Sequence, residues 1–411
     1  MAYKIRLIEK KLLEYKRFFK IVLITGARQV GKTTLLTHCF PKIKIITFDP
    51  IQDIYGVRKD PDLFLDNFPP PVILDEIQYV PELFPALKRR VDKSNATGQY
   101  FLTGSQNFSL MKNVSESLAG RVGILNLYNM TVNELYGNIN DANWLEYYLN
   151  NSKFLLKRTL NTKLPLKDIL WRGGMPGLLD ADEKFITPFF KSYVQTYIER
   201  DLRTVENIKN LYNFTTFMSF CAALSAQEIN NSKIGNDIGI SSVTAKKWYE
   251  LLINSFQFFA LQPYSGNTIK RISKKRKGFI SDTGLLCYLQ QINSPDALLA
   301  SPMFGAIFET FVVSEIKKYI NASGLNVNFY HWRTNSSAEV DLIIEKDGFL
   351  YPIEIKSKSN LNAYDARGLK SFRDTYKNKC KHSLIIYAGK ELYKISKNIT
   401  AVPWNAICKK K

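Results

Sequence analysis

Short apolar runs recur in the first part of the chain, and small or polar residues follow each of them. The runs at Ile21–Ile24, Val72–Leu74 and Tyr100–Leu102 stand between turn-forming segments. Short continuous apolar runs of this kind are typical of strands that are buried on both faces of a parallel sheet. The pattern therefore predicts an α/β domain with a parallel sheet over residues 1–160.

The middle of the chain shows a different spacing of apolar residues. Over residues 189–210 and 211–226 they recur every three or four positions, which predicts helices. A turn-rich segment at Gly173–Gly177 precedes the first of these helices. We expect residues 161–225 to be mainly helical.

A helix-turn-helix pattern follows. Residues 233–238 predict a short helix, Gly239–Ser241 a turn, and residues 242–252 a second helix that a serine can cap. The second helix is basic, as expected of a recognition helix that enters the major groove.

Two further apolar runs predict the strands of a wing after this helix pair, at Phe256–Leu261 and Gly278–Ser281. We therefore predict a winged helix-turn-helix over residues 226–285. Such a module can contact DNA or serve as an internal scaffold, and the sequence leaves both possibilities open. The loop between the strands holds six basic residues that could face a phosphate backbone: Lys270, Arg271, Lys274, Lys275, Arg276 and Lys277.

The last part of the chain predicts an α/β domain over residues 286–411. Residues 305–315 have the pattern of an amphipathic helix, and two strands begin near Glu339 and Tyr351. A turn at Lys346–Gly348 would join these strands as an antiparallel pair, which would bring Asp341, Glu354 and Lys356 to one end of the sheet.

Composition is that of a compact protein of several domains. The 411 residues are 45% hydrophobic and 13% aromatic, and the five cysteines show no spacing typical of metal ligands. The N-terminal segment lacks the apolar core of a signal peptide, and no apolar run reaches the length of a membrane span. We expect a cytoplasmic protein with reduced thiols and no membrane partner.

The formal net charge is +20, and the excess is greatest in the C-terminal third. Residues 271–411 hold 23 lysines and arginines against 12 acidic residues. This distribution favours DNA as a partner. A general lysine excess, as in AT-rich genomes, and a solvated tail at Lys409–Lys411 remain alternative explanations.

The clearest chemical motif is the segment from Gly26 to Thr33, directly after the first apolar run. A glycine-rich turn between a strand and a helix can surround the phosphates of ATP with backbone N–H groups. Lys32 would supply a countercharge, and the Thr33 hydroxyl would be a ligand of Mg²⁺. The predicted nucleotide-binding residues are Gly26, Arg28, Gly31, Lys32, Thr33, Thr34 and Asp75.

Two carboxylates end the second apolar run. Asp75 is expected to hold Mg²⁺ through its water shell, and Glu76 to polarise the attacking water. The third run ends at Thr103–Ser105, where Thr103 or Ser105 could sense the γ-phosphate or simply cap the strand end. Arg121 follows a glycine turn and could act as an arginine finger, in the same chain or on a neighbour in a homo-oligomer, or could pair with a surface acid.

Long, ordered motifs across almost the entire chain resemble one protein family. It is the AAA-type ATPase family with a C-terminal nuclease-like domain of unknown function, and the helices of residues 161–225 resemble its lid. The segments that match are the run from Arg6 through GARQVGKTTLL, DPDLFLDNFPPPVILDEIQYVPEL, GQYFLTGSQNF, SESLAGRVGIL, WRGGMPGLL, the residues Tyr197–Asp201, and KGFISDTGLL.

The C-terminal part resembles the PD-(D/E)XK nucleases, and most of all the Holliday-junction resolvases. Asp341, Glu354 and Lys356 match the acid, acid and lysine of that pattern, although Val340 stands where the family has proline. The resemblance implies that Asp341 and Glu354 bind Mg²⁺ or Mn²⁺, that Glu309 assists, and that Lys356 positions or deprotonates the attacking water. His331 is expected to be a packing residue.

Together these features predict an α/β chain: a P-loop NTPase parallel sheet with a helical lid, a winged helix-turn-helix and a C-terminal restriction-endonuclease-like domain. We expect an enzyme that binds and hydrolyses ATP with Mg²⁺ and binds DNA. Two hypotheses remain for the C-terminal domain. It could cleave DNA in a metal-dependent reaction under ATP control, or it could be an inactive nuclease fold that only binds DNA or a protein in a regulatory or signalling ATPase.

Overall fold

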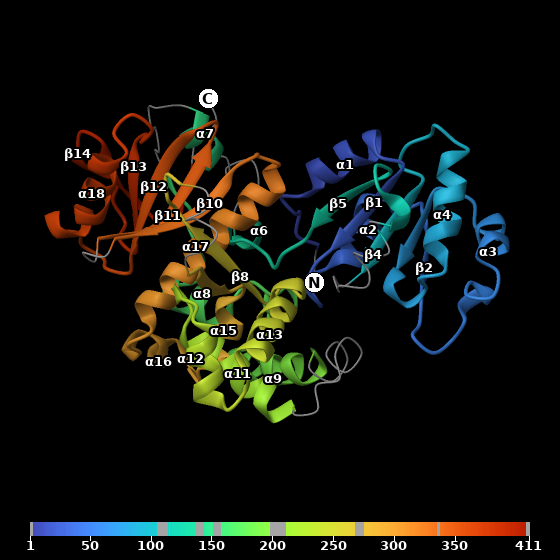
Figure 1. Cartoon of the computed structure of the whole chain (residues 1–411), viewed down its shortest axis with the longest axis horizontal. Helices are drawn as coiled ribbons and strands as arrows, with labels where there is room; N and C mark the ends of the chain where they lie inside the picture. The colour runs from blue at the N-terminus through green and yellow to red at the C-terminus, as the bar shows by residue number, and fades with distance from the viewer. Residues whose placement is uncertain are drawn as a thin grey trace.

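The computed structural model describes residues 3–104, 114, 116–136, 144–150, 158–197, 211–267, 275–334 and 338–407. Figure 1 shows three parts: a blue and cyan sheet flanked by helices, a green and yellow group of helices, and a larger sheet made mainly by the orange and red C-terminal third. The mixed α/β fold with a parallel sheet, predicted from the sequence, is confirmed.

The N-terminal sheet consists of β1 (Ile21–Thr25), β2 (Lys44–Thr47), β3 (Val72–Asp75), β4 (Tyr100–Gly104) and β5 (Val122–Asn126). Its strand order is β2-β3-β4-β1-β5, and every neighbouring pair is parallel. Ile21 and Leu23 of β1 pack into one hydrophobic cluster, whereas Val22 and Ile24 pack into another. Both faces of the strand are therefore buried, which explains its continuous apolar sequence. The associated helices are α1 (Glu9–Phe18), α2 (Lys32–Cys39), α3 (Pro61–Asn67) and α4 (Leu83–Asp92).

The middle of the chain is helical, as the apolar spacing predicted. Asn230 and Ser241 cap the two helices of the helix-turn-helix pattern, by accepting from the backbone N–H of Lys233 at 3.1 Å and of Thr244 at 3.0 Å. The turn between these helices, at Gly239, lies where it was predicted. The helices are α8 (Leu166–Arg172), α9 (Ile186–Tyr197), α11 (Leu211–Ala223), α12 (Asn231–Ile238), α13 (Ser242–Asn254), α15 (Thr283–Leu289) and α16 (Pro295–Ala300).

The larger sheet has nine strands in the order β14-β15-β13-β12-β11-β10-β8-β9-β7. Its members are β7 (Gln227–Glu228), β8 (Phe258–Pro263), β9 (Lys277–Ile280), β10 (Asn328–Arg333), β11 (Glu339–Lys346), β12 (Phe349–Lys356), β13 (Ser383–Tyr387), β14 (Tyr393–Ser396) and β15 (Ile399–Pro403). The two strands predicted as a wing, β8 and β9, therefore belong to the same sheet as the C-terminal strands. The link is the parallel pair of β8 and β10, in which Gln262 lies opposite Tyr330.

Two helices, α17 (Phe304–Ser323) and α18 (Arg367–Thr375), pack against this sheet. Leu342 and Ile344 of β11 share a hydrophobic cluster with α17, whereas Ile343 shares another with α18. The alternation along β11 places these helices on opposite faces of the sheet. The hairpin of β11 and β12 turns at Asp347 and Gly348, at the predicted place.

Short elements connect the two sheets. They are α6 (Val132–Tyr136), α7 (Trp144–Asn150), and β6 (Arg158–Thr159), which pairs with β16 (Ala406–Ile407). The Tyr351 hydroxyl of β12 donates to the Leu149 carbonyl at 2.9 Å. Residues 144–150 and 158–159 thus contact the C-terminal part, and the domain boundaries predicted at residues 160, 225 and 285 stay predictions. Turns of 3₁₀ helix lie at Ile54–Gly56, Ile77–Tyr79, Pro176–Leu178, Glu183–Phe185 and Ala363–Ala366.

Two findings on the described ranges concern membrane spans and cysteines. Within them, no helix is both long enough and apolar enough to span a membrane. The four cysteines in these ranges, Cys39, Cys221, Cys287 and Cys380, are free thiols.

Candidate nucleotide-binding site and buried acidic cluster

The glycine-rich loop joins the end of β1 to the start of α2. A Cβ atom at Gly26 would lie 2.1 Å from the Leu127 carbonyl oxygen, so only glycine permits this close approach. Gly31 has a φ of 91° immediately before α2. The loop can therefore turn tightly enough to direct its N–H groups and the N-terminus of α2 toward a phosphate.

Lys32 and Thr33 form the first turn of α2. The Lys32 ammonium donates to the carbonyls of Gly26 at 3.1 Å and Ala27 at 2.9 Å, so it lies directly at the loop. Arg28 is a half-buried residue of the loop, and Thr34 is exposed on the helix. The predicted nucleotide-binding residues are therefore adjacent in space, and their binding roles stay predictions.

Asp75 connects the loop to the ends of two other strands. The Thr33 hydroxyl donates to Asp75 Oδ1 at 2.9 Å, and the Thr47 hydroxyl donates to Oδ2 at 3.3 Å. The Thr103 hydroxyl also donates to Asp75 Oδ1. A hydroxyl and a carboxylate that converge in this way suit a Mg²⁺ ion that Thr33 binds directly and Asp75 binds through water.

Glu76 has an unusual backbone for a residue that is not glycine. Its φ and ψ are 57° and 43°, in the left-handed region. Conformations of this kind cost about 1–3 kcal/mol and are concentrated at functional sites. The Glu76 backbone N–H donates to the Thr103 hydroxyl at 3.3 Å, which helps to hold this residue directly after Asp75.

The two candidates for a γ-phosphate sensor have different outcomes. Thr103 is fully buried and bonds to Asp75 and to the Glu76 backbone, which is the geometry of a positioning residue. Ser105 lies outside the described residues, so its predicted role stays a prediction.

Arg121 lies far from the P-loop of its own chain. It precedes β5, whose first residue pairs with Ile21 at the start of β1, whereas the P-loop follows the end of β1. The five residues of β1, at about 3.3 Å each, separate the two sheet edges by roughly 16 Å. The guanidinium instead pairs with Asp92 through bonds of 2.5 and 2.9 Å. This geometry argues against a finger role within one chain, and a role toward a neighbouring chain stays a prediction.

Sequence reasoning missed a buried arginine that supports the P-loop. Arg6 donates to the Val30 carbonyl at 2.9 Å and the Tyr128 carbonyl at 2.7 Å, and pairs with Glu134 at 3.0 Å. Glu134 also accepts from the Thr131 N–H at 2.7 Å. Arg6 is therefore a positioning residue that ties the loop to the chain after β5. Nothing in the local sequence around Arg6 distinguishes it from a surface arginine.

The C-terminal acids lie together, as the strand pattern predicted. We define the acidic cluster as Glu309 of α17, Glu339 and Asp341 of β11, and Glu354 of β12. The Ile355 N–H donates to Asp341 Oδ2 at 2.9 Å. Lys356 pairs with Glu354 Oε1 at 2.5 Å, so the predicted acid, acid and lysine do meet at one place.

Lys277 corrects the prediction made for the basic loop. It was expected to face DNA, but it lies in β9, is 3% exposed and points into the acidic cluster. Its ammonium is 2.6 Å from Glu309 Oε1, 2.9 Å from Glu339 Oε1 and 3.2 Å from Asp341 Oδ1. Of the other loop residues, Lys275 and Arg276 are exposed, whereas Lys270, Arg271 and Lys274 lie outside the described residues.

Burial shifts the protonation of this cluster. Burial, and then the charge of Asp341, raise the pKa of Glu309 to about 8 and the pKa of Glu354 well above its usual range. Burial alone would lower the pKa of Lys277, but Glu309, Asp341 and Glu339 raise it well above its usual value. Lys277 therefore keeps its positive charge, which interacts with several neighbouring acidic side chains at once.

The acidic cluster has oxygen ligands of the kind that suit a divalent cation, but lysine ammonium groups lie among them. Among the described residues, no group of three or more histidine, cysteine or acidic side chains is arranged to hold a metal ion. Two lysine ammonium groups engage the carboxylates instead. This geometry does not support the metal roles predicted for Glu309, Asp341 and Glu354.

His331 agrees with its prediction as a packing residue. It is buried, and its ring nitrogen Nε2 lies 3.2 Å from the Lys275 carbonyl oxygen. Burial, and then the charge of Lys277, lower its pKa to about 4, so the ring is neutral at pH 7.

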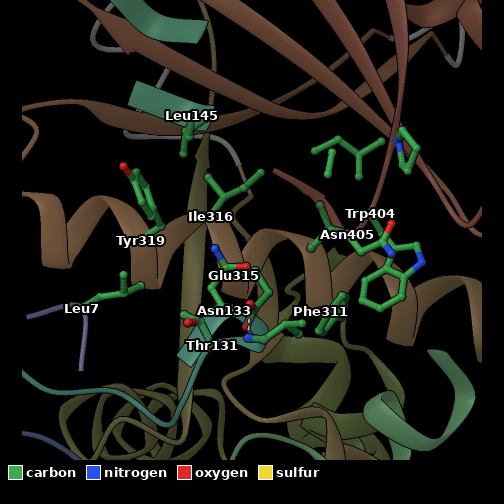
Figure 2. Close-up of a pocket in the computed structure, with 15 residues that line it drawn as sticks. Leu7, Thr131, Asn133, Leu145, Phe311, Glu315, Ile316, Tyr319, Trp404 and Asn405 are labelled. Carbon is green, nitrogen blue, oxygen red and sulfur yellow. Dashed lines mark hydrogen bonds between the residues drawn. The ribbon is translucent and has the colours of Figure 1, made fainter. Parts of the chain in front are cut away.

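A cavity of about 70 Å³ lies where α6 meets α17. Figure 2 shows Phe311, Glu315 and Ile316 of α17 around this cavity, with Thr131 and Asn133 beside Glu315. Glu315 Oε2 accepts from the Val132 N–H at 2.8 Å. None of the lining residues belongs to the P-loop. The cavity is therefore separate from the nucleotide site.

Three family models match successive parts of the chain. Residues 18–136 match a family model described as an AAA domain. Residues 164–296 and 304–407 match two families that are each described as a domain of unknown function, DUF8612 and DUF4143. The N-terminal part is therefore similar to the AAA domains, in agreement with the P-loop predicted there.

Similar proteins extend along almost the whole chain. An uncharacterized protein of Mycobacterium tuberculosis is 28% identical over 389 residues, which cover 94% of this chain and 80% of that protein. An uncharacterized protein of Haemophilus influenzae is 22% identical over 395 residues and 90% of each chain. Among solved structures, a Walker-type ATPase of Pyrococcus abyssi aligns with 69% of this chain and 94% of its own, with 16% identity and a TM-score of 0.41.

Proposed function

We propose that this chain hydrolyses ATP in a Mg²⁺-dependent reaction at the P-loop. The observation behind the proposal is the 2.9 Å contact between the Thr33 hydroxyl and Asp75, beside the Lys32 ammonium at the start of α2. Thr33 and Asp75 would hold Mg²⁺, which neutralises charge on the phosphates when bound. Lys32 and the loop N–H groups would bind the phosphate oxygens.

Glu76 is the residue that we assign to the water. Glu76 follows Asp75 directly, its backbone N–H donates to the Thr103 hydroxyl, and its carboxylate accepts from the Gln78 side-chain amide. As a general base it would accept a proton from water while the water oxygen bonds to the γ-phosphorus. The bond from that phosphorus to the β–γ bridging oxygen then breaks, and the products are ADP and inorganic phosphate.

Substitution of Thr33 tests the proposed Mg²⁺ site. We expect Thr33→Ala to raise the Mg²⁺ concentration needed for half-maximal ATP hydrolysis by about 10- to 100-fold, because one oxygen ligand and its bond to Asp75 are lost. Thr37→Ala is the matched control, since Thr37 lies on the same helix and bonds only to the carbonyls of Thr33 and Thr34 at 3.1 Å. An equal Mg²⁺ requirement in both variants would contradict the assignment.

We also propose that the chain binds DNA through α13 and does not cut it. Lys246 and Lys247 are exposed on α13, whereas Ala245, Trp248 and Tyr249 face the core, so one basic face is available to a phosphate backbone. The excess of basic residues in the C-terminal third favours the same partner. Two hypotheses were open for the C-terminal part. Binding without cleavage suits the acidic cluster better than metal-dependent cleavage, because lysine ammonium groups pair with its acids.

DNA binding and cleavage can be measured together on labelled duplex and four-way-junction DNA, with Mg²⁺ or Mn²⁺ and with or without ATP. We expect Lys246→Ala/Lys247→Ala to weaken binding roughly tenfold and to reduce the slope of log K against log salt by about 2. Lys42→Ala, an exposed lysine of the ATPase domain, is the control. Cleavage products that disappear in Asp341→Asn would instead restore the nuclease hypothesis.

A further inference from the structure

The acidic cluster already contains a cation, the ammonium group of Lys277. This lysine does not belong to the motif of Asp341, Glu354 and Lys356. We propose that the ammonium group of Lys277 occupies the position that a divalent metal ion would otherwise take between Glu309 and Asp341. The C-terminal part then folds and works without a metal ion, and the carboxylates accept one only when this ammonium is removed. The inference does not depend on nucleotide hydrolysis.

Three carboxylates from α17 and β11 lie within 3.2 Å of Lys277 Nζ. The ammonium donates hydrogen bonds to Glu339 Oε1 and Asp341 Oδ1, and it forms an ion pair with Glu309 Oε1. Glu309 Oε1 and Asp341 Oδ1 are the oxygens that a metal ion between α17 and β11 would need. A hard divalent cation binds oxygens at about 2.0–2.6 Å, so it and the ammonium cannot occupy this position together.

Because the cluster is buried, the ammonium group of Lys277 and the neighbouring acids stabilise one another's charges. Lys277 is 3% exposed, and a buried charge is costly unless it is paired and hydrogen-bonded. Two oxygens of the acidic cluster, Glu309 Oε1 and Glu354 Oε2, are buried without a hydrogen-bond partner in the described part of the chain. Glu309 Oε1 instead forms an ion pair with Lys277, so it would become free to bind a metal ion once the ammonium is removed.

The backbone of α18 closes the cluster on another side. A Cβ atom at Gly368 would lie 1.9 Å from the Glu339 carbonyl oxygen and 3.5 Å from Glu354 Oε2. Only glycine allows the helix to approach β11 so closely. Asp341 and Glu354 are consequently 7% and 6% exposed, which suits an internal ion cluster rather than a site that must reach a phosphodiester.

Titration of the nucleotide-free full chain with Mn²⁺, followed by the electron paramagnetic resonance signal of free Mn²⁺, tests this assignment. We expect the wild type and Asp341→Asn to bind equal amounts of Mn²⁺. We expect Lys277→Ala to bind one additional Mn²⁺ per chain and to gain several degrees in Tm with Mn²⁺, and both gains to vanish in Lys277→Ala/Asp341→Asn. Lys275→Ala, an exposed lysine on the same segment, should behave as the wild type.

Two results would overturn the assignment. One is an additional Mn²⁺ bound by the wild type that Asp341→Asn loses, because the ammonium would then not exclude the metal. The other is a folded Lys277→Ala that binds no additional Mn²⁺. If Lys277→Ala does not fold, Lys277→Ala/Glu339→Gln replaces it, since this pair removes one charge of each sign and keeps Glu309, Asp341 and Glu354. ATP hydrolysis of every variant is measured in parallel, so that a failure of the P-loop proposal is recognised separately.

Discussion

Lys32→Ala is expected to lose ATP binding, and its rate of ATP hydrolysis is expected to fall at least about 100-fold as a consequence. Lys32 is the cation at the first turn of α2, and its Nζ lies 2.9 Å from the Ala27 carbonyl at the loop. Alanine keeps the helix and the glycines but removes the charge that offsets the phosphates. Isothermal titration with ATP and Mg²⁺ measures the binding, and a phosphate-release assay measures the hydrolysis.

Lys42→Ala is the control for this loss, because Lys42 is an exposed lysine shortly after the same helix. Since Lys32 is buried, the Tm of both variants without nucleotide should be compared with that of the wild type. Normal ATP binding by a folded Lys32→Ala would show that the loop from Gly26 to Thr33 is not a nucleotide site.

Glu76→Gln is expected to separate binding from chemistry. Hydrolysis should fall by about 100- to 10,000-fold, the usual effect of removing a general base, while ATP binding is kept. Glutamine has the same shape and can keep the left-handed backbone and the bond from its N–H to Thr103. Bound nucleotide recovered from the variant after incubation with ATP should therefore be mainly ATP.

The control for this substitution is Glu82→Gln, which changes an exposed acid a short distance along the chain. If Glu76→Gln hydrolyses ATP at the wild-type rate, another residue activates the water. If it fails to bind ATP, Glu76 has a structural role in the site. Lys32→Ala thus tests the assignment of ATP binding, and Glu76→Gln tests the assignment of ATP hydrolysis.

Elements that depend on residues close in the sequence were predicted well. The loop from Gly26 to Thr33 lies between β1 and α2, and Asp75 ends β3, because a buried strand and the turn after it are specified locally. The helix pair α12 and α13 has its turn at Gly239, since capping residues act within one helical turn. The AAA domain match agrees with this local evidence.

Features that depend on distant pairing were missed. The parallel contact of Gln262 with Tyr330 joins the predicted wing to the C-terminal sheet, and no residue near either position indicates it. The bond from Arg6 to Val30 spans 24 positions and its ion pair with Glu134 spans 128. Local sequence patterns do not indicate contacts between residues this far apart in the chain.

The sequence by itself determined the phosphate-binding loop, the acid that follows β3 and the order of acids in the C-terminal part, because these are fixed by residue type and short spacing. Only the tertiary structure decided what surrounds them. Lys277 looked like one more lysine of a basic loop, yet the pairing of β8 with β9 turns it inward among Glu309, Glu339 and Asp341. Whether a lysine faces solvent or neutralises buried acids depends on which strand lies beside it, and chain segments far apart in sequence set that arrangement.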